Sequence, residues 1–505
     1  MSEKKASVKM EAPPELEAQS TLAHILHNDA MGAIILLLAA TVAFFVANTD
    51  TITLMGTGLS EWYQWVWHVD FGLSVHHIEI VKPLHLWIND GLMAIFFFIV
   101  GLEIKRELLV GELATLRKAL LPIVAAIGGM VVPALVYWLV NRGDEGASGW
   151  GIPMATDIAF AVGVLGLMSK RVPQSMAVFL IALAIVDDLG AVLVIALFYT
   201  EQIAFQPLII GFVLIMSSAI MARMGVRSVT VYILMFVLIW LTFMNSGVHA
   251  TIAGVLFAFT IPVDARYVTP LFISRINQLL QRFHDAEDHV NPLLVNNRQQ
   301  RLVRAIENEC IHVEAPLQRI MNKLHPFSAF LIMPIFAFAN AGVQIDLSGI
   351  GEMLFHKVTL GIILGLFFGK QIGVFLFSFL IVKLGVAELP TGMKWRQVYA
   401  LSCLAAIGFT MSLFISELAF KSGDAHGAVV HAATVELNAP MVPAENSAHG
   451  ADAIVHKIDN RNVQNIHLAE AKVGTLVASI LAGVWGSIML FWATIGVKKE
   501  AVADH

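Results

Sequence analysis

The chain has 505 residues, of which 57% are hydrophobic and only 14% are charged. Soluble domains usually carry about 25% charged residues, so this composition excludes an ordinary soluble protein and indicates a polytopic membrane protein. The net charge of -6, without a basic domain or basic stripe, argues against a nucleic-acid partner. The two cysteines, Cys310 and Cys403, do not suggest a disulfide framework.

Residues 1-30 are polar, carry charges of both signs and predict a disordered tail. The following apolar runs predict an all-α membrane domain of about twelve transmembrane helices over residues 31-497, with residues 498-505 as a second short tail. These runs lie near residues 31-48, 86-104, 119-140, 149-168, 174-199, 207-222, 228-244, 247-262, 326-346, 357-383, 397-420 and 473-497.

Loop charges predict the orientation of these helices. With the N-terminus inside, most basic residues of the short loops fall on the inner side, whereas the outer short loops carry only Arg142 and Lys357. Both termini are therefore expected in the cytoplasm. Three longer segments remain, at 49-85 outside, 263-325 inside and 421-472 outside. The second has helical spacing of charges and predicts an amphipathic insertion, and the third reads as flexible.

The run at 180-200 carries two adjacent carboxylates, Asp187 and Asp188, near its middle. A charge at bilayer depth costs a few kcal/mol on insertion scales, so ionisable residues there are candidates for function. The alternative is a pair held in fixed salt bridges as packing, although helix packing would hardly need two neighbouring acids.

Two other runs are interrupted by polar residues and glycines. The run at 149-168 contains Thr156 and Asp157, and the run at 397-420 contains Gly408 and Thr410. Non-helical backbone survives at membrane depth only where protein or water satisfies its polar groups, so broken spans point to a site. Ordinary glycine-mediated helix packing is the competing interpretation.

Lys370 is a third ionisable feature deep in a span. A buried ammonium needs a carboxylate nearby, and Asp187 or Asp188 could supply it. If these groups share a cavity, carboxylate oxygens, freed backbone oxygens and the Thr156 hydroxyl could hold a small hard cation.

Seven motifs, in this order, resemble the NhaA-type sodium/proton antiporters: FFFIVGLEIKREL, ATDIAFAVGVL, FLIALAIVDDLGAVLVIALFYT, NSGVHATIAGVLFAFTIP, LHPFSAFLIMPIFAFANAGV, FGKQIGVFLF and IGFTMSLFI. The resemblance covers about residues 30-420 and the last span. It implies twelve spans in inverted-topology repeats, with the fourth and eleventh spans unwound and crossing. Gly408 and Thr410 would support the unwound eleventh span.

The same resemblance assigns roles to individual residues. Asp187 and Asp188 would bind Na⁺ and protons, with Lys370 as the buried lysine facing them. Asp157 and Lys370 would also offset the dipole ends of the broken helices.

Charged groups at the cytoplasmic mouth, Glu103 and Arg106, would take part in regulation by pH, and His325 is a further candidate. The alternative is that GLEIKREL is a helix end whose lysine and arginine side chains reach the membrane surface. Familiar members often have a glutamate and a histidine shortly before the His325-Pro326 pair, whereas Met321 and Asn322 stand here. Glu417 adds an acid near the outer end of the eleventh span. It is either a helix-end residue or part of an outward ion path.

The resemblance implies a transporter rather than an enzyme. It would exchange Na⁺ or Li⁺ for H⁺ without a cofactor, in the inner (plasma) membrane of a bacterium, as a homodimer through the segment 49-85. A sodium-coupled solute symporter is the main alternative, but no signal for an organic-substrate pocket stands out. An intramembrane aspartyl protease needs its two aspartates on separate helices, and a channel needs a filter that this sequence does not suggest.

Overall fold

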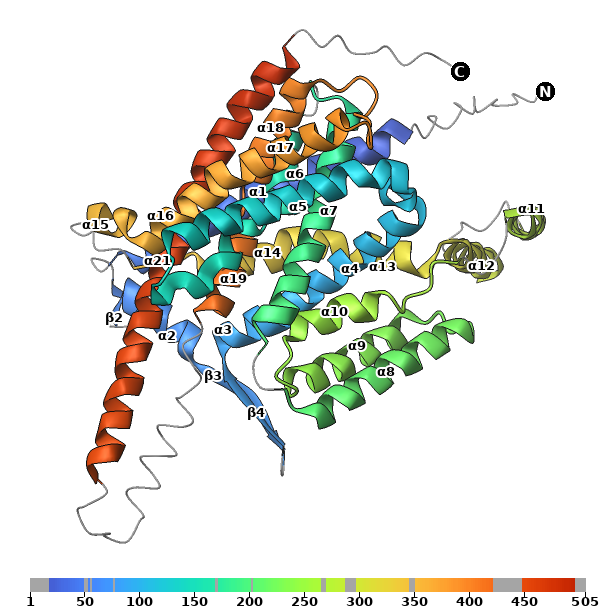
Figure 1. Cartoon of the computed structure of the whole chain (residues 1–505). Helices are drawn as coiled ribbons and strands as arrows, with labels where there is room; N and C mark the ends of the chain where they lie inside the picture. Colours follow the sequence, from blue (N-terminus) through green and yellow to red (C-terminus); the bar gives the residue numbers. More distant parts are fainter. Residues whose placement is uncertain are drawn as a thin grey trace. The chain divides into compact units, whose positions relative to one another are not determined.

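The computed structural model describes residues 18-49, 53-54, 57-75, 78-168, 171-200, 203-264, 269-286, 297-344, 350-420 and 447-495. The chain forms two compact units, and most of their helices and strands are labelled in Figure 1. Unit 1 comprises Met1–Phe45, Leu121–Ala184 and Ala341–His505, and unit 2 comprises Val46–Leu120 and Ile185–Asn340. Three of the boundaries fall inside helices, namely α1, α5 and α7, which therefore contribute residues to both units.

Among its described residues, unit 1 contains helices and connecting segments but no strand. Its elements are α1 (Ala18–Ala47), most of α5 (Leu116–Val140), the 3₁₀ helix η3 (Glu145–Met154), α6 (Ile158–Leu167), the first part of α7 (Gln174–Phe198), α15 (Ile350–Phe355), α16 (Lys357–Ile363), the π-helix η5 (Leu364–Gly369), α17 (Lys370–Lys383), α18 (Trp395–Ala405), α19 (Phe409–Ala419) and α21 (Ser447–Thr494).

Unit 2 contains the remaining helices and four short strands. Its helices are α2 (Leu59–His68), α3 (Leu84–Leu86), the π-helix η1 (Trp87–Leu92), α4 (Met93–Val110), the 3₁₀ helix η2 (Glu112–Ala114), the rest of α7, α8 (Phe205–Arg223), α9 (Val229–Met244), α10 (Ala250–Ala258), α11 (Thr269–Asp285), α12 (Asn297–Val313), α13 (Pro316–Phe327), the π-helix η4 (Ser328–Ile332) and α14 (Met333–Asn340).

The strands form two antiparallel hairpins. β1 (Thr53–Leu54) pairs with β2 (Thr57–Gly58). β3 (Asp70–Val75) pairs with β4 (Ile78–Pro83) in a register that places Asp70 opposite Pro83 and Val75 opposite Ile78. Both hairpins lie in the segment 49-85, where the sequence predicted a long loop between helices and no strand.

The apolar runs of the sequence correspond to helices of the structure. Among the described residues, nine helices are long and apolar enough to cross a membrane, and the pair α18 and α19, bent by 45°, gives a tenth span if it is counted as one. The other two predicted runs contain α9, with 16 residues, and α10, with nine. The expected all-α polytopic membrane fold is therefore confirmed.

Two predicted boundaries were wrong. Helix α1 begins at Ala18, inside the tail that we expected to be disordered up to residue 30. Helix α21 begins at Ser447, so the second part of the segment 421-472 is helical rather than a flexible loop. Neither helix contains a proline in its first part, so nothing there interrupts the helix of the adjacent span, which extends towards the N-terminus. Residues 1-17, 421-446 and 496-505 lie outside the described residues.

Small residues bring the helices of unit 1 close together. A Cβ atom added at Gly373 of α17 would lie 2.1 Å from the backbone oxygen of Gly128 in α5. One added at Gly369 would lie 2.8 Å from the Cα atom of Pro133, also in α5. Such backbone contact is the usual basis of helix packing in membranes, where burial of apolar surface gives little driving force. These glycines fix the beginning of α17, where Lys370 lies.

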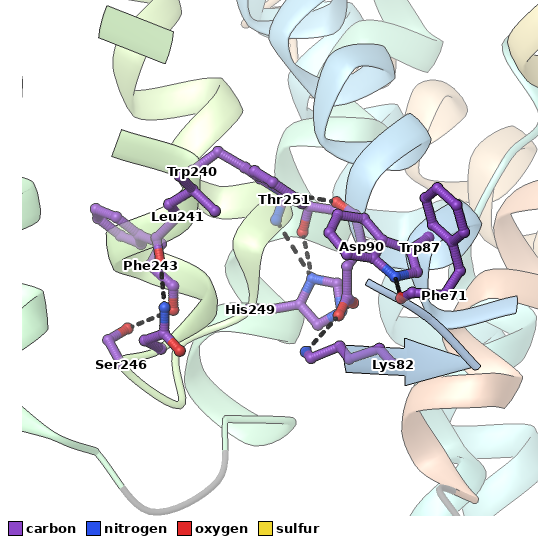
Figure 2. A network of polar contacts seen from close by, with 11 residues as sticks. Phe71, Lys82, Trp87, Asp90, Trp240, Leu241, Phe243, Ser246, His249 and Thr251 are labelled. Atoms are coloured by element: carbon purple, nitrogen blue, oxygen red, sulfur yellow. Dashed lines mark hydrogen bonds and ion pairs between the residues drawn. The ribbon is translucent and has the colours of Figure 1, made fainter. Parts of the chain in front are cut away.

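Unit 2 has an aromatic and aliphatic core. It is formed by Phe98, Leu102, Tyr232, Ile239, Phe243, Ala253, Phe257, Ala258, Ile261, Leu317, Ile320 and Met321. Helix α10 packs directly on α4, because a Cβ atom at Gly254 would lie 2.4 Å from the Ala94 oxygen. This contact places the N-terminus of α10 next to η1, the region drawn in Figure 2.

Candidate functional site

The two interrupted runs of the sequence are broken helices that contact each other within unit 1. Between η3 and α6 the backbone is extended at Ala155 and Asp157. The Asp157 N–H donates to the Ile407 oxygen at 2.7 Å, and the Thr156 hydroxyl donates to the Ala405 oxygen at 2.9 Å. Each break thus supplies hydrogen-bond partners for the other, as backbone away from water requires.

Asp157 joins the N-termini of two helices. Its side chain is fully buried. One carboxylate oxygen, Oδ1, accepts from the Phe160 N–H of α6 at 2.9 Å. The other, Oδ2, accepts from the N–H and the hydroxyl of Thr410, in the first turn of α19, at 3.0 and 2.5 Å. The first N–H groups of a helix have no partner inside the helix and carry partial positive charge, so an acid between two such ends satisfies both.

The side chain of Lys370 lies at a helix C-terminus, whereas Asp157 lies between two helix N-termini. It is the first residue of α17, directly after the π-helix η5, and its side chain is 1% exposed. Its Nζ donates to the backbone oxygen of Met154, the last residue of η3. A cation at a helix C-terminus is electrostatically favourable. Asp157 and Lys370 thus lie at helix ends of the sign that each side chain complements.

Gly408 and Ser412 determine how closely the broken helices approach. A Cβ atom at Gly408 would lie 2.9 Å from the Ala155 oxygen and 2.4 Å from Ser412 Oγ. The Ser412 hydroxyl donates to the Ile152 oxygen at 2.8 Å, within η3. We did not predict Ser412 as a site residue, although it lies in the same polar break as Gly408 and Thr410.

Asp187 and Asp188 lie on α7 and are 2% and 1% exposed. They belong to unit 2, whereas Thr156, Asp157 and Lys370 belong to unit 1. The pairing of Asp187 with Lys370 and the cavity shared by all three groups stay predictions. Neighbouring helical residues point about 100° apart, and here both side chains of the pair are buried.

The residues predicted for regulation lie in unit 2. His325 of α13 and Glu103 of α4 approach each other, with 4.0 Å between Nε2 and Oε1. Arg106 pairs with the adjacent Glu107 at 3.1 Å. Met321, at one of the two positions where the family often has an ionisable residue, is a core residue and 4% exposed.

The structure also places Glu417 and the two cysteines. Glu417 forms an ion pair with Lys472 of α21 at 2.5 Å. Its side chain is 19% exposed, and its role at the helix end or in an ion path stays a prediction. Both cysteines are free, Cys403 being buried and Cys310 exposed.

A polar network that we did not predict lies at the N-terminus of α10 in unit 2 (Figure 2). His249 precedes α10, and its Nδ1 lies 2.7 Å from the Thr251 hydroxyl oxygen and accepts from the Thr251 N–H. Nε2 faces Asp90 Oδ1 at 3.6 Å, and Lys82 of β4 pairs with Asp90 Oδ2 at 3.4 Å. Trp240 donates to the Asp90 backbone oxygen at 3.1 Å. In the sequence, the histidine of the motif NSGVHAT is the feature that could have pointed to this network.

A cavity of about 460 Å³ in unit 1 is lined by other residues than those predicted for the site. Glu470 of α21, in its wall, contacts His356 Nδ1 at 2.5 Å and His467 Nδ1 at 3.1 Å. The cavity thus lies beside a contact between α16 and α21, and no sequence prediction concerned it.

The chain matches known proteins over most of its length. The family profile described as Na+/H+ antiporter 1 covers residues 23–440. The Na(+)/H(+) antiporter NhaA 1 of Saccharophagus degradans is 47% identical over 391 residues, which cover 77% of this chain and 82% of that protein. The Na(+)/H(+) antiporter NhaA of Sulfurimonas denitrificans is 39% identical over 465 residues, which cover 92% of this chain and 94% of that protein.

A solved structure of a sodium proton antiporter from Methanocaldococcus jannaschii also matches, with a TM-score of 0.40 and 13% sequence identity, covering 92% of this chain and 99% of that chain. The assignment rests on the sequence matches, which agree with the multi-pass helical fold. The chain therefore belongs to the Na+/H+ antiporter 1 family.

Proposed function

We propose that this protein exchanges Na⁺ or Li⁺ for H⁺ across a bacterial inner membrane. The observation that carries the proposal is the contact between two broken helices, with the fully buried Asp157 between two helix N-termini and Lys370 at a helix C-terminus. Broken helices at membrane depth are typical of transporter sites, where ions meet freed backbone and buried charge. Membership of the family supports the same activity.

The exchange would follow from competition at Asp187 and Asp188. Na⁺ binds only when these carboxylates have lost their protons, so loading one ion requires the release of the other. With one competing proton, the apparent cation affinity falls about tenfold for each unit by which the pH drops below the pKa of the site. With two competing protons it falls about a hundredfold. The two acids act as a coupled pair, so individual protons are not assigned.

Alternating access would come from rocking of one group of helices against another, with the site occupied by either ion. A cycle that moves more protons than sodium ions is electrogenic. Glu103 and His325, which approach each other in unit 2, are the candidates for control by pH. We further propose cytoplasmic termini and a homodimer to which the segment 49-85 contributes.

Transport by everted membrane vesicles tests the proposal. A pH gradient is formed by respiration, and the loss of the gradient is followed after addition of Na⁺, Li⁺ or K⁺. We expect Na⁺ and Li⁺ to collapse the gradient and Asp188→Asn to abolish the response. Asp70→Asn, at an exposed position of β3, is the matched control and should respond as the parent does.

Responses that do not depend on Na⁺ or Li⁺, or an Asp188→Asn variant as active as the parent, would exclude this function. Lys370→Ala tests the second buried charge. We expect a displaced pH profile or a changed number of charges per cycle in proteoliposomes, whereas an unchanged profile and unchanged charge movement would remove Lys370 from the mechanism.

A further inference from the structure

Two histidines of unit 2, His68 and His85, lie next to each other although they belong to different helices. Their ring centroids are 5.4 Å apart, and the ring planes are tilted by 50°. His68 is the last residue of α2, and His85 is the middle residue of α3. The Leu84 N–H donates to the Val69 oxygen at 3.0 Å, so the backbone itself holds the end of α2 beside the beginning of α3.

Both rings direct the same nitrogen atom to the backbone. His68 Nδ1 lies 2.7 Å from the Gln64 oxygen, and His85 Nδ1 lies 3.1 Å from the Trp67 oxygen. A carbonyl oxygen can only accept a hydrogen bond, so in each neutral ring Nδ1 carries the proton and Nε2 keeps its lone pair. Within the part of the chain that the structure describes, neither Nε2 atom has a hydrogen-bond or ion-pair partner.

This arrangement is typical of histidines that bind metal ions. In such sites the ring nitrogen that does not bind the metal donates to a carbonyl or carboxylate oxygen, which fixes the tautomer and the orientation of the ring. The separation of the rings also suits a single ion. Two imidazoles on one tetrahedral ion, with metal–nitrogen bonds of about 2.0–2.1 Å, have their ring centres about 5 Å apart. The observed distance is 5.4 Å.

The surroundings allow a hydrated ion to reach both rings. His68 is exposed and His85 is half-buried. Imidazole nitrogen suits Zn²⁺, Cu²⁺ and Ni²⁺, whereas Mg²⁺ and Ca²⁺ prefer oxygen. Among the described residues, no third histidine, cysteine or acid completes the set. Water therefore fills the remaining positions around the ion, as in metal sites that keep open positions.

Helix capping explains only part of this geometry. A histidine in the last turn of a helix often donates to a free carbonyl of that helix, and the contact of His68 with Gln64 fits this role. His85 belongs to another helix, however, and its contact with the Trp67 oxygen caps the end of α2 from outside. Capping does not require that the two rings lie together with both Nε2 atoms free.

We propose that His68 and His85 form a binding site for a divalent transition metal ion, such as Zn²⁺. His85 lies at the beginning of the candidate membrane span Leu84–Val110, whereas His68 ends α2. A bound ion ties α2 to the beginning of this span. The site takes no part in the exchange of Na⁺ and H⁺ and does not depend on that function.

Chemical modification of the full-length protein in detergent tests the site. Diethyl pyrocarbonate acylates accessible imidazole nitrogens, and mass spectrometry of the peptides follows each histidine separately. We expect Zn²⁺ at ten times its dissociation constant to slow the acylation of both His68 and His85 about tenfold. His284, an exposed histidine of α11, is the matched control and should react at the same rate with and without Zn²⁺. Mg²⁺ should protect none of the three.

Reciprocal variants test whether the two rings bind one ion. His68→Gln should remove the protection of His85, and His85→Gln should remove that of His68. Each should raise the Zn²⁺ concentration for half protection at least tenfold, since the loss of even an outer-shell partner typically costs 10–100-fold in metal affinity. His284→Gln should leave the protection of both rings unchanged. Unaltered elution of the variants in gel filtration shows that they are folded.

Acylation of the parent protein at the same rate with and without Zn²⁺ would overturn the proposal. Protection of one ring that survives replacement of the other would contradict it as well, because each histidine would then bind alone. Equal protection by Mg²⁺ would attribute the effect to ionic strength, and protection that rises with protein concentration would place the ion between two copies of the chain. Either result would exclude the site.

Discussion

Asp157 in unit 1 and Asp90 in unit 2 both lie beside the beginning of a helix, but different groups compensate their charge. Asp157 is fully buried and accepts hydrogen bonds from backbone N–H groups and from the hydroxyl of Thr410. The side chain of Asp90 is 17% exposed and faces Lys82 and His249. One acid thus accepts hydrogen bonds from backbone N–H groups and a hydroxyl, whereas the other faces a lysine and a histidine side chain.

The difference follows from access to water. Close to the surface, an ion pair between long side chains costs little desolvation and contributes little, with a median of about 0–1 kcal/mol. In a fully buried place, unpaired donors are costly, so fixed N–H groups and an acid that accepts from them stabilise each other. The contact between the broken helices should therefore depend strongly on each partner, whereas the network around Asp90 should tolerate substitution.

The largest effect is expected from Asp157→Ala. It leaves the N–H groups of Phe160 and Thr410 and the Thr410 hydroxyl without their acceptor, at a cost of about 1–3 kcal/mol for each unsatisfied group. We expect a loss of several kcal/mol, measured by chemical unfolding of the purified protein in detergent. Asp157→Asn keeps one acceptor oxygen and should fall between the parent and the alanine variant. Equal stability of all three proteins would contradict the structural role of Asp157.

Gly408→Ala tests the approach of the two broken helices. The added Cβ would lie 2.9 Å from the Ala155 oxygen, so the backbone must shift, with a typical cost of about 1–3 kcal/mol for an overpacked site. A lower midpoint of thermal unfolding is the expected result. Gly351→Ala is the matched control, because nothing lies within 4 Å of a Cβ atom there. Similar midpoints for the two variants would show that the approach at Gly408 is looser than described.

Thr410→Val separates the side chain from the backbone at the same site. The N–H of residue 410 still reaches Asp157, but the 2.5 Å hydrogen bond from the hydroxyl is lost. We expect a destabilisation of about 1–3 kcal/mol, which is smaller than that of Asp157→Ala. A double-mutant cycle with Asp157→Asn should give a coupling energy that is clearly different from zero. Strict additivity would mean that the hydroxyl acts independently of Asp157.

Asp90→Asn should have the smallest effect. Its ion pair with Lys82 joins side chains that are 31% and 17% exposed, so a change within about 1 kcal/mol is expected. The remaining stabilisation should weaken in concentrated salt, because screening acts on partly exposed charges. Unfolding of the parent and of the variant at low and high salt measures both points. A loss as large as that of Asp157→Ala would refute the contrast between the two aspartates.

Several elements of the fold follow from local sequence alone. Apolar runs such as that of α7 predict spans because a membrane helix needs about 20 apolar residues. Gly408 and Asp157 marked broken spans, because glycine and polar residues weaken a helix where no water can replace its hydrogen bonds. The hairpin of β3 and β4 was not predicted, since short strands depend on their pairing with each other and leave a weak local pattern.

What the sequence by itself determined is the class of protein, the position of its spans and the residues at the breaks. Hydropathy and helix-breaking residues are local properties, and the bilayer makes their consequences strict. Only the tertiary structure determined which groups form hydrogen bonds with each other. Thr410 donates to an acid 253 positions away, and Lys370 donates to the oxygen of Met154, because long-range packing of unit 1 brings these helix ends together.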